Sequence, residues 1–219
     1  MVLGLTTNQK GSLRDRQILE TVERCQVLNT EQITALIFKG ISHGHKKAQA
    51  RLLKLYKGKR IKRLRYTLTE PYCYYLGRKH GRLEHLLELN WVYVWLVNGL
   101  RSWERLEHFY YEYPLKILQP DALAGIKNTV TGKTKFTFVE LDRSDNDFDK
   151  VEKYNRWYES DGYTSQWWAD LTDRFPDILV VTTTARRRAR IQERIERENT
   201  NGLEFKALLL DEIKGGIEL

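Results

Sequence analysis

Three acidic residues near the middle of the chain have a spacing that suits metal chemistry. Asp121 follows Pro120, and Glu140 and Asp142 lie further on, in the segment KFTFVELD. If that segment is a strand, its side chains alternate between two faces, so Glu140 and Asp142 point the same way. With Asp121 at the end of a neighbouring strand, these oxygens suit Mg²⁺ or Mn²⁺, which can position water against a phosphodiester. Ordinary turn and helix-cap roles for Asp121 and Asp142 are the alternative interpretation.

A second group is a run of positive charge over residues 45–65, which holds ten Lys or Arg and no acidic residue. If residues 44–56 form a helix, its turn of about 100° per residue places Lys47, Arg51 and Lys54 on one stripe. The roughly opposite side is apolar, with Ala48, Leu52, Leu55 and Tyr56. We therefore expect the apolar side to pack on a core and the basic side to face a polyanion.

The charge of the whole chain points to the same partner. Residues 1–100 hold 18 Lys and Arg against 7 Asp and Glu, whereas residues 101–219 hold 19 against 22. Because each neutralised phosphate releases condensed counterions, the basic first part favours double-stranded DNA as its ligand. We expect the basic helix to enter the major groove and the next strand to hold the backbone or the minor groove. The predicted DNA contacts are Lys46, Lys47, Arg51, Lys54, Lys59, Arg60, Lys62, Arg63 and Arg65.

Short helices and a hairpin must position these basic residues. Apolar spacing predicts helices over 13–27, 30–38 and 44–56, followed by a hairpin of 60–68 with 72–76. Asn29 with Gln32 fits the capping pattern of the second helix, and Ser42 is placed to cap the third. Three short helices followed by a hairpin are the layout of a winged helix-turn-helix.

The pattern changes in the second part of the chain to alternating strands and helices. Strands are expected over 115–118, 135–141, 178–182 and 205–210, with helices over 147–158 and 185–198. A further helical pattern over 81–100 is expected to pack on the hairpin, to link the two parts or to mediate dimerisation. The sequence therefore predicts an α+β protein with three regions, residues 1–80, 81–100 and 101–219.

The carboxylate spacing, P-D-(x18)-E-x-D, resembles that of the PD-(D/E)xK nuclease superfamily. The resemblance implies a nuclease-like α/β domain in residues 101–219, with Asp121, Glu140 and Asp142 as metal ligands and catalytic candidates. The superfamily places a lysine where this chain has Asp142, and a carboxylate does not supply its positive charge. Lys153 on the next helix is a candidate to reach back into the site. The departure favours a binding protein over an active nuclease.

Segments spread over residues 13–210 carry a second resemblance. They are RDRQIL, LNTEQITALIF, KKAQARLLKLYKGKRIKR, HLLELN, the pair Trp103-Glu104, QPDAL, FTFVELDRS, the pair Lys153-Tyr154 and FPDILVVTTTARRRARI. In their order and spacing they resemble the replication-relaxation family of plasmid and mobile-element proteins. The resemblance implies a winged-helix DNA-binding protein with a PD-(D/E)xK-like C-terminal domain, acting in replication initiation or DNA relaxation. It also implies that Glu104 is the upstream carboxylate of the nuclease-like core.

These observations leave three functions open. We expect a DNA-binding protein of a plasmid or mobile element that acts as a homodimer, since paired half-sites match two-fold symmetry. A Mg²⁺- or Mn²⁺-dependent DNA nickase is the enzymatic alternative, and a transcription repressor is the other. No cofactor besides such a metal is expected. Cys25 and Cys73 lie in apolar surroundings, which favours free thiols in a reducing compartment. No apolar stretch suits a signal peptide or a membrane span, so we expect a cytoplasmic protein.

Overall fold

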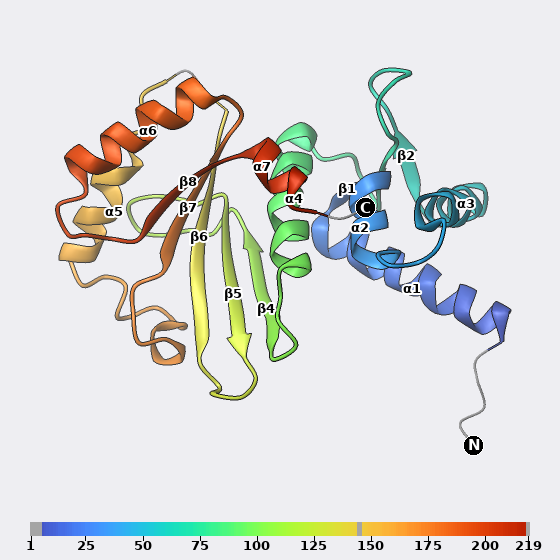
Figure 1. Ribbon diagram of the computed structural model, residues 1–219, viewed down its shortest axis with the longest axis horizontal. Helices are drawn as coiled ribbons and strands as arrows, with labels where there is room; N and C mark the ends of the chain where they lie inside the picture. Colours follow the sequence, from blue (N-terminus) through green and yellow to red (C-terminus); the bar gives the residue numbers. More distant parts are fainter. Residues whose placement is uncertain (1–5, 144–145, 218–219) are drawn as a thin grey trace. The chain divides into compact units, whose positions relative to one another are not determined.

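The computed structural model describes residues 6–143 and 146–217, which divide into two compact units. The first unit comprises the described residues up to Val94 together with Ile217, and the second comprises the described residues of Trp95–Gly216. Each unit combines helices with one β-sheet, so the predicted α+β class is confirmed. The arrangement of the elements within each unit can be followed in Figure 1.

The first unit is built from helices around a small antiparallel sheet. Its elements are α1 (Thr7–Cys25), β1 (Val27–Asn29), α2 (Thr30–Ile37), α3 (Gly44–Lys57), β2 (Lys62–Leu64), β3 (Cys73–Tyr75) and the larger part of α4 (Leu83–Asn98). The strand order is β1-β3-β2, with β3 antiparallel to both neighbours. β1 was not expected from the sequence, and it turns the predicted hairpin into a three-stranded sheet.

Local capping chemistry explains where the first helices begin. α1 starts earlier than predicted because Thr6 and Gln9 form a capping box ahead of it. The predicted capping box of Asn29 with Gln32 is confirmed at the start of α2. Ser42 does not cap α3, because the residue before that helix is His43, in the left-handed conformation with φ 55° and no side-chain cap.

The division between the units falls inside α4, after Val94, whereas the sequence placed a linking helix over the whole of 81–100. The first part of α4 is anchored in the first unit by Leu83, Leu86 and Leu89, which are buried. Asn90 is buried there as well, and its amide donates hydrogen bonds to the carbonyl oxygens of Cys25 (3.0 Å) and Val27 (2.6 Å). The buried Asn90 amide therefore links α4 to the end of α1 and to β1.

The second unit is a mixed sheet, and the helices of residues 150–159 and 185–198 pack on one of its faces (Figure 1). Its elements are β4 (Glu104–Tyr111), β5 (Ala122–Asn128), β6 (Thr134–Asp142), α5 (Lys150–Glu159), the 3₁₀ helix η1 (Ala169–Leu171), β7 (Asp177–Thr182), α6 (Ala185–Glu198), β8 (Phe205–Leu209) and α7 (Leu210–Gly215). The strands follow one another in chain order, antiparallel from β4 to β6 and parallel from β6 to β8. The strand predicted over 115–118 is not formed, and β4 occupies a segment for which none was predicted.

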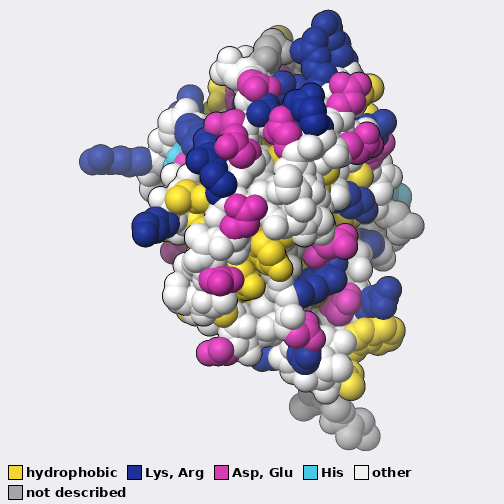
Figure 2. All heavy atoms as spheres, turned by 90° about the vertical axis from the view of Figure 1, so that its left-hand side faces the viewer, with side chains coloured by type: hydrophobic (Ala, Val, Ile, Leu, Met, Phe, Trp, Pro, Cys, Tyr) yellow, Lys and Arg dark blue, Asp and Glu magenta, His cyan; other side chains and the backbone are white. Residues whose placement is uncertain are grey.

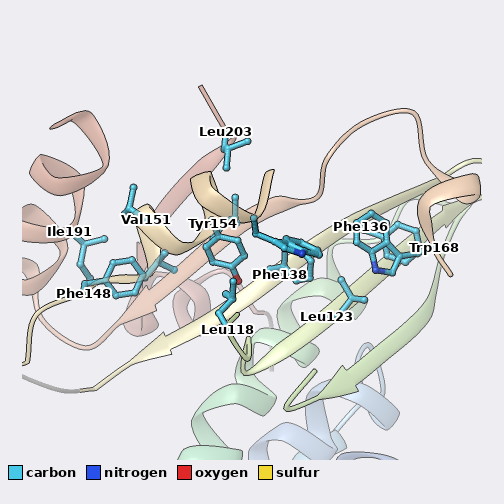
Figure 3. Packing of buried hydrophobic residues seen from close by; sticks show 13 residues of the cluster. Leu118, Leu123, Phe136, Phe138, Phe148, Val151, Tyr154, Trp168, Ile191 and Leu203 are labelled. Carbon is cyan, nitrogen blue, oxygen red and sulfur yellow. The ribbon is translucent and has the colours of Figure 1, made fainter. Parts of the chain in front are cut away.

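Aromatic and aliphatic side chains fill the space between the sheet and its helices (Figure 3). Phe136 and Phe138 of β6 pack there with Tyr154 of α5, Ile191 of α6 and Trp168. Glu140 and Asp142 follow the two phenylalanines at two-residue spacing, so they lie on the same covered face of β6. The two-residue period of β6 therefore places both carboxylates on the face that the helices cover.

Candidate functional site

The outward side of α3 is rotated from the stripe that the sequence predicted. Ala48, Leu52 and Leu55 are buried, which confirms the apolar side except for Tyr56, whose exposed fraction is 40%. At about 100° per residue, the direction opposite the buried residues belongs to Lys46, Ala50, Leu53 and Lys57, all exposed. Lys47 and Lys54 are also exposed and flank this outward stripe. The helix therefore presents lysines around two apolar side chains.

Arg51, predicted to face DNA, is instead held against α1. Its Nε donates to Asp15 Oδ1 (2.7 Å), and its Nη2 donates to the carbonyl oxygen of Gly11 (2.7 Å). A Cβ atom on Gly11 would lie 3.0 Å from the guanidinium, so the glycine gives Arg51 the room to reach that carbonyl. Asp15 is buried, and this ion pair joins α3 to α1. Arg51 therefore stabilises the fold, and we withdraw it from the predicted DNA contacts.

The predicted basic residues beyond α3 differ in how firmly they are held. Lys59 and Arg60 are exposed, directly after the helix. Lys62 is exposed too, although its ammonium group donates to the carbonyl oxygen of Gly77 (2.6 Å). Arg63 is half-buried between two tyrosine rings, with its guanidinium 4.1 Å from the centroids of both Tyr56 and Tyr72. This stacking fixes the base of the hairpin to α3 and explains why Tyr56 is not in the core.

Arg65 is held near the tip of the hairpin. Its guanidinium lies 4.8 Å from the centroid of Tyr72, and its Nη1 donates to the carbonyl oxygen of Leu68 (3.1 Å). Because the guanidinium keeps its charge in these contacts, the hairpin presents positive charge in an ordered geometry. Arg63 and Arg65 are therefore positioned cations, unlike the lysines of α3, which extend into solvent.

A cleft of about 440 Å³ separates α3 from the hairpin. Its walls are Thr30 and Glu31 of α2, His45, Gln49 and Leu53 of α3, and Arg63, Arg65, Thr69, Glu70, Pro71, Tyr72 and Tyr74 of the hairpin. Of the predicted DNA contacts, only the two hairpin arginines line it. Gln49 and Leu53 were not among the residues that the sequence singled out. Their signal was weak because neither carries charge.

The second candidate site is the carboxylate group of the mixed sheet. Ala122 pairs with Val139, so the antiparallel register places Asp121 beside Glu140. Asp121 Oδ2 accepts a hydrogen bond from the Leu141 amide (2.8 Å). The predicted approach of these two carboxylates is therefore present in the structure.

Glu140 is buried, with an exposed fraction of 1%. It accepts a hydrogen bond from the Tyr154 hydroxyl (2.8 Å) and forms an ion pair with Lys150. Burial raises the pKa of Glu140 to about 7, because the charged form loses its hydration; Asp121 adds to this rise and Lys150 opposes it. Burial also raises the pKa of Tyr154 well above its ordinary value, with the charge of Glu140 as the second cause. The tyrosine therefore acts as a hydrogen-bond donor.

Asp142 does not join Asp121 and Glu140 around a common point. It forms an ion pair with Arg187 of α6, whose Nη2 also lies 3.2 Å from Asp142 Oδ1. Within the described ranges, no group of three or more His, Cys, Asp or Glu is arranged to hold a metal ion. The predicted three-carboxylate metal site is thus replaced by two carboxylate–cation pairs, Glu140 with Lys150 and Asp142 with Arg187.

Two further catalytic candidates lie elsewhere. Lys153 pairs with Asp149 one turn away in the same segment, and the lysine that reaches Glu140 is Lys150, which the sequence did not single out. Glu104 accepts a hydrogen bond from the Arg101 amide (2.9 Å) and pairs in the sheet with Asn128, the last residue of β5. At about 3.3 Å per residue, that end of β5 lies about 23 Å from Asp121. Neither Lys153 nor Glu104 belongs to the carboxylate group.

The arginine-rich helix α6 has a different charge pattern from α3. Besides Arg187, ion pairs hold Arg188 to Glu212 (2.5 Å) and Arg194 to Glu198 (2.5 Å). Figure 2 shows Lys and Arg side chains interspersed with Asp and Glu on the side of the molecule that carries α5 and α6. Most of the positive charge of α6 is therefore balanced by neighbouring carboxylates.

No family model matches this sequence, and no curated protein matches it. The resemblance to the replication-relaxation family therefore rests on the segments of the chain itself. In the part of the chain that the structure describes, no helix combines the length and the apolar composition that crossing a bilayer requires.

Proposed function

We propose that the protein binds double-stranded DNA through α3 and the β2–β3 hairpin. The observation that carries this proposal is the outward side of α3, where Lys46, Lys47, Lys54 and Lys57 surround Ala50 and Leu53 with no acidic residue in the helix. Lysines of this kind contact phosphates, whereas small and apolar side chains between them can approach base edges. The proposal replaces the predicted stripe of Lys47, Arg51 and Lys54 with one centred on Lys46, Ala50, Leu53 and Lys57.

The order of the elements in the first unit supports this proposal. Helices α1, α2 and α3 with strands β1, β2 and β3 follow the sequence of a winged helix-turn-helix, in which the third helix reads the major groove. The hairpin of β2 and β3 takes the place of the wing. Its cations, Arg63 and Arg65, are suited to the sugar–phosphate backbone or to the minor groove.

The second unit supports the proposed likeness to PD-(D/E)xK nucleases in its order of elements. The meander of β4, β5 and β6 is followed by α5 and a parallel strand, β7, and Asp121, directly before β5, lies beside Glu140 of β6 as that superfamily's pattern expects. Because Lys150 and Arg187 balance the carboxylates, we propose that this unit serves chiefly as a scaffold. We also propose that the protein acts as a homodimer, in plasmid replication initiation or in DNA relaxation.

Removing two outward lysines tests the DNA interface. For Lys46→Ala with Lys57→Ala, we expect affinity for a 30-base-pair duplex to fall roughly tenfold to a hundredfold, uniformly across sequences. The slope of log affinity against log salt should become shallower by about 2, since each phosphate contact contributes about 0.9. Fluorescence anisotropy titrations from 50 to 250 mM NaCl measure both quantities.

The matched control is Arg186→Ala with Arg190→Ala, which removes the same charge from two exposed positions of α6. Its affinity and salt slope should stay close to those of the unchanged protein. Equal losses in both variants would show that net charge, and not the α3 surface, drives binding. Footprinting then separates the roles: iterated sites at an origin support an initiator, and a single promoter site supports a repressor.

A metal-dependent DNA nickase is the second candidate, and one observation favours it. Lys150 brings a positive charge to Glu140, beside Asp121, so two carboxylates and a lysine lie together although the motif lysine is absent at position 142. Supercoiled plasmid incubated with the protein and Mn²⁺ tests this function. Nicked circles that vanish in both Asp121→Asn and Lys150→Ala would establish it. If the unchanged protein nicks no more plasmid than those variants do, only the binding function remains.

A further inference from the structure

Gln49 is an exposed residue of α3 that also lines the cleft beside the hairpin. Resting on the proposed binding of duplex DNA, we propose that Gln49 selects an adenine in the DNA site through a hydrogen-bonded pair with that base. His45 acts as the positioning residue for its amide. Such a contact adds base selectivity to the general affinity of the lysines, because one side chain then distinguishes one base pair from another.

A chain of hydrogen bonds determines how the Gln49 amide is oriented. The Thr34 hydroxyl donates its only proton to the carbonyl oxygen of Thr30 (2.8 Å), so toward His45 Nδ1, at 3.5 Å, its oxygen acts as an acceptor. An amide nitrogen has protons to donate and cannot accept, so the Gln49 nitrogen donates to His45 Nε2, which lies 3.0 Å away. The amide nitrogen and oxygen are thereby distinguished.

The Gln49 amide keeps one N–H and its oxygen for a base after this bond. Adenine presents the matching pair in the major groove, an acceptor at N7 beside a donor at N6. Guanine presents two acceptors there, so a donor–acceptor pair does not satisfy it. Because His45 already restricts the side chain, less conformational entropy is lost on binding than for an unrestrained glutamine.

The neighbours of Gln49 favour the same base pair. Leu53 lies one turn further along α3, with an exposed fraction of 39%, and Ala50 is also exposed. An apolar side chain in the centre of a lysine-rich surface has no favourable contact in water, but the methyl group of thymine offers one. Thymine is the partner of adenine, so Gln49 with Leu53 or Ala50 matches an A·T pair. Lys46 and Lys57 remain available for the phosphates on either side.

Selection from a random duplex library tests the proposal. The unchanged protein should enrich adenine at one position by at least tenfold over the other bases. Gln49→Ala should lose that preference and keep the others, and alanine leaves the helix intact because its helix propensity is the highest. Gln49→Arg should move the preference to guanine, whose two acceptors suit a guanidinium. His45→Ala should weaken the preference for adenine at that same position.

Lys46→Ala is the matched control on the same helix. It should lower affinity for every sequence by a similar factor and leave the base preference unchanged. A Gln49→Ala pool with the same adenine preference as the unchanged protein would overturn the inference while leaving DNA binding in place. Absence of any duplex binding by the unchanged protein would overturn both. The two failures are therefore distinguishable in one experiment.

Discussion

Replacing Arg51 by alanine is expected to lower the free energy of unfolding by about 2 to 3 kcal/mol. Removing one partner of a fully buried ion pair costs about 3–5 kcal/mol because the remaining charge is stranded. Asp15 would be that stranded group, since its side chain is 8% exposed, while the 24% exposure of Arg51 reduces the cost below the fully buried case. The carbonyl oxygen of Gly11 would also lose the hydrogen bond that Arg51 donates.

Urea denaturation at pH 7 measures this loss, and Lys54→Ala is its control. Lys54 lies on the same helix and is exposed, and its substitution removes the same charge. The free energy of unfolding of Lys54→Ala should therefore differ from that of the unchanged protein by less than about 0.5 kcal/mol. The duplex affinities should follow the opposite order at a temperature where all variants are folded. Arg51→Ala would then retain most of its affinity, and Lys54→Ala would lose more. Unfolding of Arg51→Ala at the same urea concentration as the unchanged protein would contradict the assigned role.

Glu140→Gln is expected to stabilise the protein by about 3 kcal/mol at pH 8 and to have little effect at pH 5. The pKa of Glu140 is about 7 in the folded protein against an ordinary 4.5. Between these pH values, the folded chain keeps a proton that the unfolded chain has released, so stability falls as pH rises through this window. Each pKa unit is worth about 1.4 kcal/mol, and above pH 7 the loss is complete.

Glutamine removes this dependence because it has no proton to release. Its oxygen can still accept from the Tyr154 hydroxyl, and Lys150 is 29% exposed, so its ammonium group can turn to water. Denaturation curves at pH 5, 6, 7 and 8 give the difference between variant and unchanged protein. Glu193→Gln, at an exposed position of α6, is the control and should give a difference that does not vary with pH. A Glu140→Gln difference that is equally constant would refute the raised pKa.

Local patterns in the sequence predicted the elements whose stability is local. The capping pair of Asn29 and Gln32 lies within one turn, so it identifies the start of α2 without tertiary information. The apolar positions of α3 and the two-residue period of β6 likewise depend only on backbone geometry. That is why Ala48 and Leu52 are buried as predicted, and why Glu140 and Asp142 share a face.

Elements with few local signals were missed or misplaced. β1 is only three residues long and exists through its pairing with β3, distant in the sequence. β4 has an irregular burial pattern, interrupted by a register shift between Leu106 and His108, so no clean alternation marks it. α1 contains Gly11, which weakens the helical signal although the Thr6 and Gln9 capping box starts the helix before it.

Charge and backbone periodicity are properties of neighbouring residues, so the α+β class, the basic character of α3 and the common face of Glu140 and Asp142 could be predicted from the amino-acid sequence. Which charges meet depends on the packing of the folded chain. Arg51 reaches Asp15 on another helix, and Lys150 rather than Lys153 reaches Glu140. Such pairs depend on how helices pack and on the direction of each side chain. Neighbouring Lys and Arg side chains carry the same charge on long flexible chains, so the sequence does not show which of them reaches a given carboxylate.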